Sequence, residues 1–238
     1  GIRDLVLSLV GSEMCIRDSY YPSMQSKLIL TTTLCLAIFI GCSTPEPPTI
    51  NFYRAVHIGD IDQIERNLYW NVDVNKPGPD GLTALHVAVH KGSLVVVKML
   101  LRHDADLEAT DGEGNTPLAA ALLARNTLVA DYLVNQQAMV DANALLEKTI
   151  RQGKADRDVI DFLVKHGAEL NSPNAQGNPP LHQSILDGYR VIAKNLVRKG
   201  ADINARNSAG HTPLELAMEI GEQDIARMLR QFGADTSP

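Results

Sequence analysis

The sequence predicts an all-α solenoid made of stacked helix-turn-helix units. Two observations support this prediction: a short motif recurs at a spacing of 33 residues, and a second motif recurs at the same spacing in constant phase with the first. The composition agrees, because only 5% of the 238 residues are aromatic and alanine and leucine must fill the interior. A fixed period of this size is the signature of a repeat protein.

The first motif opens a unit with glycine, a polar turn, and a leucine at the start of a helix. It occurs at residues 81–86, 114–118, 177–182 and 210–214. Leu85 and Leu118 lie 33 residues apart, as do Leu181 and Leu214. The residues that we expect to build each opening are Thr83, Leu85, His86, Thr116, Pro117, Leu118, Leu181, His182, Thr212, Pro213 and Leu214.

The second motif closes a unit with an alanine that is followed directly by an acidic residue. It occurs at residues 105–108, 167–171, 200–204 and 233–235, and Ala168, Ala201 and Ala234 are again spaced by 33 residues. Between the two motifs, Gly92, Gly188 and similar glycines should end a first helix, and an apolar run at helical spacing predicts a second one.

These motifs, their period and their phase resemble the ankyrin-repeat family from about Asn51 to Asp235. The resemblance implies a domain over residues 51–238 of about six units, each with two helices and a β-turn finger. The first unit lacks the opening motif, as capping repeats often do. Stacking of neighbouring units would supply the core, because no single unit can bury its own apolar face.

One unit, near residues 141–171, is degenerate. Leu118 and Leu145 are only 27 residues apart, and the loop before this unit is short. Residues 153–157 partly restore the length between its two helices. We therefore expect both helices to be kept, the finger to be lost, and the regular stack to be broken locally.

The segment from Met24 predicts a signal peptide over residues 24–41. It has one positive charge at Lys27 and an apolar run from Leu28 to Ile40 that is shorter than the roughly 20 residues of a membrane-spanning helix. Its end resembles a bacterial lipobox, which implies acylation of Cys42. The proline-rich residues 42–50 would then form an extended tether.

This reading places the domain in the bacterial cell envelope, anchored by lipid to the outer membrane and facing the periplasm. The alternatives are an ordinary signal peptide with Cys42 incidental, which gives a soluble periplasmic protein, and a cytoplasmic protein. Residues 1–23 precede the expected start at Met24 and look like a non-native extension; otherwise they are genuine and Cys15 is functional.

Composition argues against several classes of function. Twenty-two Lys and Arg against 28 Asp and Glu give a net charge of −6, so we expect no nucleic-acid partner. From Ser43 onward the sequence has no Gly-x-Ser-x-Gly motif, Walker loop, Rossmann fingerprint or cysteine nucleophile. We therefore expect no catalytic residues, no cofactor and no small-molecule substrate.

Histidines are candidates for a metal site, and acidic pairs are candidates for calcium binding or acid–base catalysis. His86 and His90 lie four residues apart on one predicted helix, as two metal ligands could, but the resemblance gives His86 and His182 a structural role. The acidic residues Asp104, Asp106, Asp111 and Glu113 fall on turns between units, where such residues favour the turn itself. We therefore expect no metal site.

The remaining candidate is a surface for a protein partner. In ankyrin proteins the partner usually meets the fingertips and the exposed side of the first helices, on the concave face. The residues placed there are Leu82, His90, Lys91, Glu113, Asn115, Leu123, Gln176, Asn178, Leu186, Asp187, His211 and Glu219. Three of them are leucines that we expect to be exposed, unless Leu123 and Leu186 point inward.

The sequence thus predicts a non-catalytic, membrane-tethered module that binds a protein partner. An immunity protein that neutralises a toxin or an envelope enzyme is a more specific alternative. An enzyme with an unrecognised active site is the third hypothesis.

Overall fold

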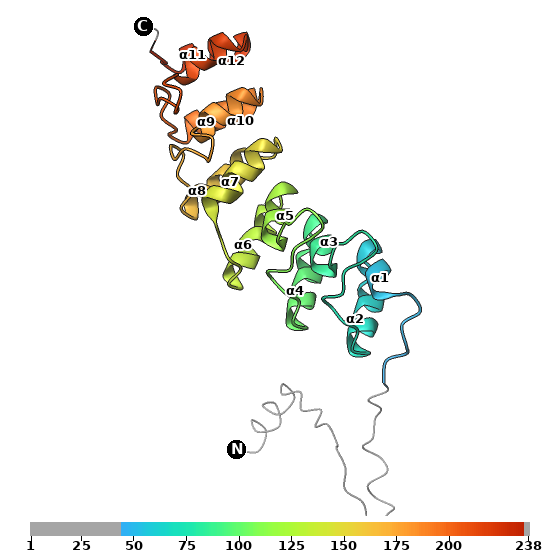
Figure 1. Cartoon of the computed structure of the whole chain (residues 1–238). Coiled ribbons are helices and arrows are strands. Elements are labelled where there is room, and N and C mark those ends of the chain that lie inside the picture. Colours follow the sequence, from blue (N-terminus) through green and yellow to red (C-terminus); the bar gives the residue numbers. More distant parts are fainter. Residues whose placement is uncertain (1–43, 236–238) are drawn as a thin grey trace, which may run out of the picture. The chain divides into compact units, whose positions relative to one another are not determined.

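The structure, a computed structural model, describes residues 44–235 and contains twelve helices and no strand within them (Figure 1). The helices form six consecutive pairs: α1 (Phe52–Ile58) with α2 (Ile61–Tyr69), α3 (Ala84–His90) with α4 (Leu94–Arg102), α5 (Pro117–Leu123) with α6 (Thr127–Asn135), α7 (Ala142–Arg151) with α8 (Arg157–Lys165), α9 (Pro180–Leu186) with α10 (Arg190–Arg198), and α11 (Pro213–Glu219) with α12 (Gln223–Gln231). The all-α solenoid is confirmed.

Each pair packs on its neighbours along the stack. The first helices contact one another in order from α1 to α11, and among the second helices α6, α8, α10 and α12 do the same. The leucines of the opening motif lie between units, and Leu85, Leu118, Leu181 and Leu214 are each at most 2% exposed. Burying each of them contributes about 1.5 to 3 kcal/mol to stability.

Local chemistry starts the first helices. Thr83, Thr116 and Thr212 each cap a helix, because the side-chain oxygen accepts a hydrogen bond from the backbone amide three residues on. At α11 the cap is reciprocal, since Glu215 accepts in turn from the Thr212 amide at 2.8 Å. Proline follows threonine at α5 and α11, where the first helical position needs no amide donor.

Four loops between pairs form fingers, at residues 78–82, 111–115, 174–178 and 207–211. Each finger is closed by a backbone hydrogen bond from its first amide to its last carbonyl, at 2.8 to 3.0 Å. The fourth pair has no finger, because α7 begins directly after the short loop that follows α6.

The degenerate unit keeps a full core. Leu146 and Ile150 are at most 1% exposed, whereas Leu145 is only half-buried. Leu146, and not Leu145, therefore takes the place that Leu118 has in the unit before. The reason is that α7 starts early at its Asp141 cap, which adds helix where the finger would be.

The predictions for the signal peptide, Cys42 and residues 1–23 lie outside the described residues. Residues 44–50 form no helix, and several of them contact α2. The Thr49 amide donates to Gln63 at 2.8 Å, Asn67 donates to the Ile50 carbonyl at 3.0 Å, and Arg66 pairs with Glu46 at 3.1 Å. Residues 46–50 are therefore docked on α2.

Candidate protein-binding surface

One polar side chain organises each of the last three fingers. The Asp111 carboxylate accepts from the backbone amides of Glu113 at 2.9 Å and Asn115 at 2.8 Å, and also from the Asn115 side chain. Asn174 and Asn207 accept in the same way from the residues two and four positions further on. Such side-chain turns fix the fingers without strands.

Hydrogen bonds lower the pKa of one aspartate in each of the first two fingers, Asp80 and Asp111. Burial alone would raise the pKa of Asp111, but hydrogen bonds from Asn115 and the Glu113 amide hold that pKa below its ordinary value. A hydrogen bond from the Tyr53 hydroxyl likewise holds the pKa of Asp80 below its ordinary value. With the exposed Glu113, these groups give the fingers an acidic rim.

Histidines of the opening motif tie neighbouring fingers together. His86 is fully buried, and its Nε2 donates to the Asn115 carbonyl at 3.0 Å while its Nδ1 lies 2.8 Å from the Thr83 hydroxyl. Because a carbonyl only accepts, the proton is on Nε2 and Nδ1 accepts from Thr83. Both ring nitrogens are engaged, so His86 has no free nitrogen for a metal.

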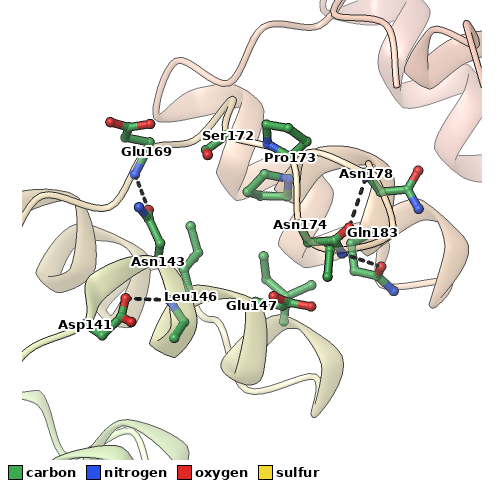
Figure 2. A pocket seen from close by; sticks show the side chains of 14 residues that line it. Asp141, Asn143, Leu146, Glu147, Glu169, Ser172, Pro173, Asn174, Asn178 and Gln183 are labelled. Carbon is green, nitrogen blue, oxygen red and sulfur yellow. Dashed lines mark hydrogen bonds between the residues drawn. The ribbon is translucent and has the colours of Figure 1, made fainter. Parts of the chain in front are cut away.

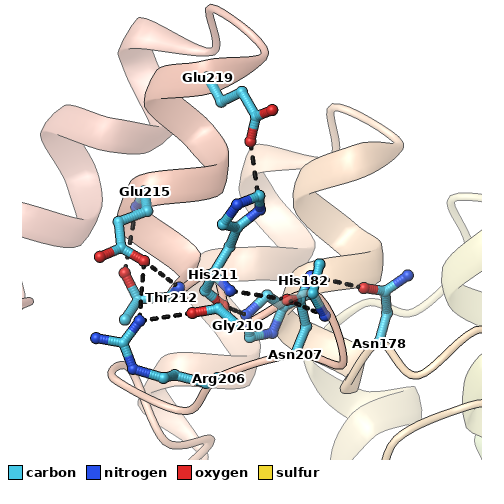
Figure 3. A network of polar contacts seen from close by, with 10 residues as sticks. Asn178, His182, Arg206, Asn207, Gly210, His211, Thr212, Glu215 and Glu219 are labelled. Carbon is cyan, nitrogen blue, oxygen red and sulfur yellow. Dashed lines mark hydrogen bonds and ion pairs between the residues drawn. The ribbon is translucent and has the colours of Figure 1, made fainter.

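Figure 3 shows the equivalent network in the last two units. His182 Nε2 donates to the His211 carbonyl at 2.9 Å, and the Asn207 side chain donates to Asn178 at 3.0 Å. Burial, partly offset by the bond to His211, lowers the pKa of His182 and keeps it neutral. Its Nδ1 has no partner, because Pro179 stands where Thr83 stands in the second unit.

A shallow hollow of about 390 Å³ lies between the first two fingers and the end of α7. It brings together five of the predicted partner residues: Leu82, His90, Glu113, Asn115 and Leu123. Leu82, Ala120 and Leu123 supply apolar surface. The sequence analysis missed the other polar lining residues, which are Asp80, Asp111, Gln152 and Lys154.

A second hollow of about 300 Å³ lies beside the degenerate unit (Figure 2). The start of α7 forms one wall with Asp141, Asn143 and Glu147, and the third finger forms the other with Asn174 and Asn178. It occupies the place next to the third finger where a regular unit would put its own finger. The signal for it in the sequence was the short loop before Asp141.

The predicted partner residues fall into three groups by exposure. Those with exposed side chains are His90, Lys91, Glu113, Gln176, Leu186, Asp187 and Glu219. Those that are half-buried are Leu82, Leu123, Asn178 and His211. Asn115 alone is buried, at 4% exposed.

Four of these residues are less exposed than the sequence analysis expected. The Asn115 side chain is turned inward because it donates to Asp111 at 2.8 Å, so it closes the finger and offers no exposed tip. Asn178 is held by Asn207 and serves the scaffold as well. Leu82 and Leu123 are half-buried, whereas Leu186 is exposed at 42%.

Among residues 44–235, no group of His, Cys, Asp and Glu side chains is arranged to hold a metal ion. Nor does any helix of that range have the length and apolar character needed to cross a membrane.

Two stretches of the sequence, residues 52–144 and residues 146–238, each match a family model that describes three ankyrin repeats. The chain belongs to the ankyrin-repeat family. Ankyrin repeats are in general non-catalytic modules of protein–protein interaction. Family membership therefore indicates an interaction module, and the hollows beside the fingers agree with that class.

Curated ankyrin proteins resemble the chain over different lengths. Rabankyrin-5 of Mus musculus is 25% identical over 187 residues, which cover 69% of this chain but 16% of that protein. Protein phosphatase 1 regulatory subunit 27 of Homo sapiens is 41% identical over 125 residues, which cover 52% of this chain and 77% of that protein.

Two solved structures share the fold. A chain from the complex of the Bd0816 predatory endopeptidase of Bdellovibrio bacteriovorus with immunity protein Bd3460 has a TM-score of 0.60 and 26% identity, covering 77% of this chain and 98% of that chain. The ankyrin repeat domain of Bcl-3 has a TM-score of 0.62 and 23% identity, covering 81% and 90%.

Proposed function

We propose that this ankyrin domain binds a protein partner through its fingers and the adjoining ends of its first helices, without turnover. The observation that carries the proposal is the hollow between the first two fingers. There an apolar floor of Leu82, Ala120 and Leu123 is bordered by the carboxylates of Asp80 and Glu113. An apolar centre with a polar rim is the usual anatomy of a protein interface.

The scaffold of this surface is rigid, which favours recognition of a folded partner. Asp111, Asn174 and Asn207 fix the backbones of the last three fingers. His86 and His182 tie the second and fourth fingers to the units before them. A preorganised surface loses little conformational entropy on binding. The acidic groups near the hollow are already engaged in closing turns, which favours a binding role over acid–base chemistry.

We further propose that the domain is tethered by an acylated Cys42 to the bacterial outer membrane and faces the periplasm. The support is the signal-like run of residues 24–41, the lipobox-like end at Cys42 and the proline-rich segment behind it. If acylation does not occur, the same signal would give a soluble periplasmic domain.

One experiment tests both parts. The full chain is expressed in the envelope of the source bacterium, and its membrane association and partner affinity are compared with those of variants. Cys42→Ser should release the chain from membranes and leave affinity unchanged. The pair Glu113→Lys and Gln176→Lys should lower affinity about tenfold or more, because both side chains are exposed on finger tips.

The matched control places the same charge changes on second helices, with Glu65→Lys and Gln231→Lys, which are equally exposed. This pair should leave affinity within about twofold. Equal losses from both pairs would contradict recognition through the fingers, and membrane retention of Cys42→Ser would contradict the lipid tether.

A second candidate is an immunity protein that inhibits an enzyme of the cell envelope. The specific observation is the match to a chain of the endopeptidase–immunity protein complex, which covers 98% of that chain at 26% identity. If an endopeptidase gene lies beside this one, the test is to express that enzyme in a bacterial periplasm, with and without the chain. Survival only with the wild-type chain, and not with the finger pair, supports inhibition; death in every case argues against it.

A further inference from the structure

Helix α10 carries a row of positive charges that the proposed partner surface does not use. Arg190, Lys194 and Arg198 follow one another at intervals of four residues, so they lie on one side of the helix. Lys199 follows directly, and no acidic residue interrupts the segment. This row, called here the α10 stripe, stands out in a chain whose net charge is −6.

The α10 stripe is not explained by ion pairs within the domain. Arg190 and Arg198 are exposed and Lys194 is half-buried, and within residues 44–235 none of the three forms an ion pair. Like charges four residues apart on a helix repel one another and weaken it. The stripe therefore works against folding stability, and an external anion bound to it would relieve this repulsion.

Neighbouring helices add positive charge on balance. A hollow of about 260 Å³ beside the stripe is lined by Arg157, Asn195, Arg198 and Lys199. Asp161 of α8 lies next to this hollow. Its carboxylate already pairs with Lys199, and its Oδ2 lies 4.0 Å from Arg157 Nε.

Helix α12 borders the stripe on its other side. Its single acid, Asp224, pairs with Arg227 at 3.3 Å, and Arg230 remains beyond that pair. Within the part of the chain that the structure describes, two further acids lie nearby without an ion pair, Asp158 at the start of α8 and Glu222 at the cap of α12. Cations on α8, α10 and α12 still outnumber the acids. The surface around α10 therefore presents a net positive potential to whatever approaches it.

The stripe and the tether both belong to second helices. Residues 46–50 dock on α2, the second helix of the first unit, and the stripe lies on α10, the second helix of the fifth. The finger hollows, in contrast, are lined by finger residues and first helices, with the turn after α7 at one edge. A flat anionic surface that met the second helices would leave the fingers free for a partner.

We propose that the α10 stripe, with Arg157 and Lys199 beside it, binds the headgroups of an anionic phospholipid bilayer. Lys and Arg side chains near such a surface are drawn to its negative potential, which falls off within a Debye length. The proposal extends the tethering by Cys42 but does not depend on it. It gives the domain an orientation on the membrane, with its second helices toward the lipid.

The test uses residues 44–238, which lack Cys42 and the apolar run but keep the whole core, since every core residue lies between Phe52 and Ala234. Co-sedimentation is measured with vesicles of phosphatidylcholine alone and of phosphatidylcholine mixed with phosphatidylglycerol. The domain should bind only the mixed vesicles. The triple variant Arg190→Gln, Lys194→Gln and Arg198→Gln should bind them about a hundredfold more weakly, since each cation contributes about fivefold.

The control variant Arg54→Gln, Lys76→Gln and Lys148→Gln has the same net charge and the same pattern of exposure, two exposed side chains and one half-buried. It should bind within about threefold of the wild type, and urea unfolding should show both variants folded. Equal binding by the wild type and the stripe variant overturns the proposal. So does binding of the wild type to inorganic phosphate, DNA or an acidic protein in place of the mixed vesicles.

Because this assay contains neither Cys42 nor a protein partner, its outcome is separate from that of the proposed function. Failure here would leave the finger surface and the tether untouched.

Discussion

Replacing Gly177 by alanine is expected to lower the free energy of unfolding by about 3 kcal/mol. Gly177 has a φ of +77°, in the left-handed region where a Cβ costs about 1 to 2 kcal/mol. The added Cβ would also overlap with the side chain of Ser208 in the next finger. Overpacking of this kind costs a further 1 to 3 kcal/mol or so. Urea unfolding measures the loss.

Gly114→Ala is the matched control. Gly114 occupies the same position in the second finger with a φ of +75°, but no atom lies within 4 Å of an added Cβ, because the unit that follows has no finger. This change should cost only about 1 to 2 kcal/mol, the backbone part alone. Equal losses in the free energy of unfolding at the two glycines would contradict this account, in which Gly177 lies against a following finger and Gly114 does not.

Removing the His86 side chain should also have a large effect. His86→Ala deletes two buried hydrogen bonds, leaves the Asn115 carbonyl with only its bond from the Asp111 amide, and opens a cavity. We expect a loss of about 3 kcal/mol in the free energy of unfolding. His182→Ala deletes one such bond and should cost about 2 kcal/mol. A loss below about 0.5 kcal/mol for His86→Ala would show that the histidine does not tie the fingers.

The repeat motifs made the fold predictable because they encode local chemistry. Thr83 and Thr116 cap helices, Pro117 and Pro213 begin them, and the buried leucines mark the contacts between units. All of these act within one unit or between adjacent units. A solenoid requires nothing of longer range, so a short sequence pattern is sufficient to specify it.

The motif also held information about the fingers that the sequence analysis did not use. His86 and His182 each reach forward to a carbonyl in the next finger. Ala119 stands at this position in the third unit, and the unit after it has no finger for a histidine to reach. The missing histidine and the short loop before Asp141 are therefore two signs of the same gap.

The orientation of individual side chains was less predictable. Asn115 and Glu113 both lie on a finger, but the hydrogen bond to Asp111 turns Asn115 inward, and spacing alone does not reveal such a choice. The docking of residues 46–50 depends on polar groups of α2 that no motif marks. The α10 stripe was visible as cations every four residues, yet the acidic net charge of the whole chain concealed it.

Position-resolved photo-crosslinking in the envelope of the source bacterium tests the central claim most directly. A photoreactive residue is placed at Glu113 or Gln176 on the finger tips, or at Val95 or Gln231 on second helices, all four of which are exposed. The account predicts one discrete protein adduct from both finger positions and none from the second-helix positions. Adducts of equal yield from all four positions, or no protein adduct from the fingers, would contradict it.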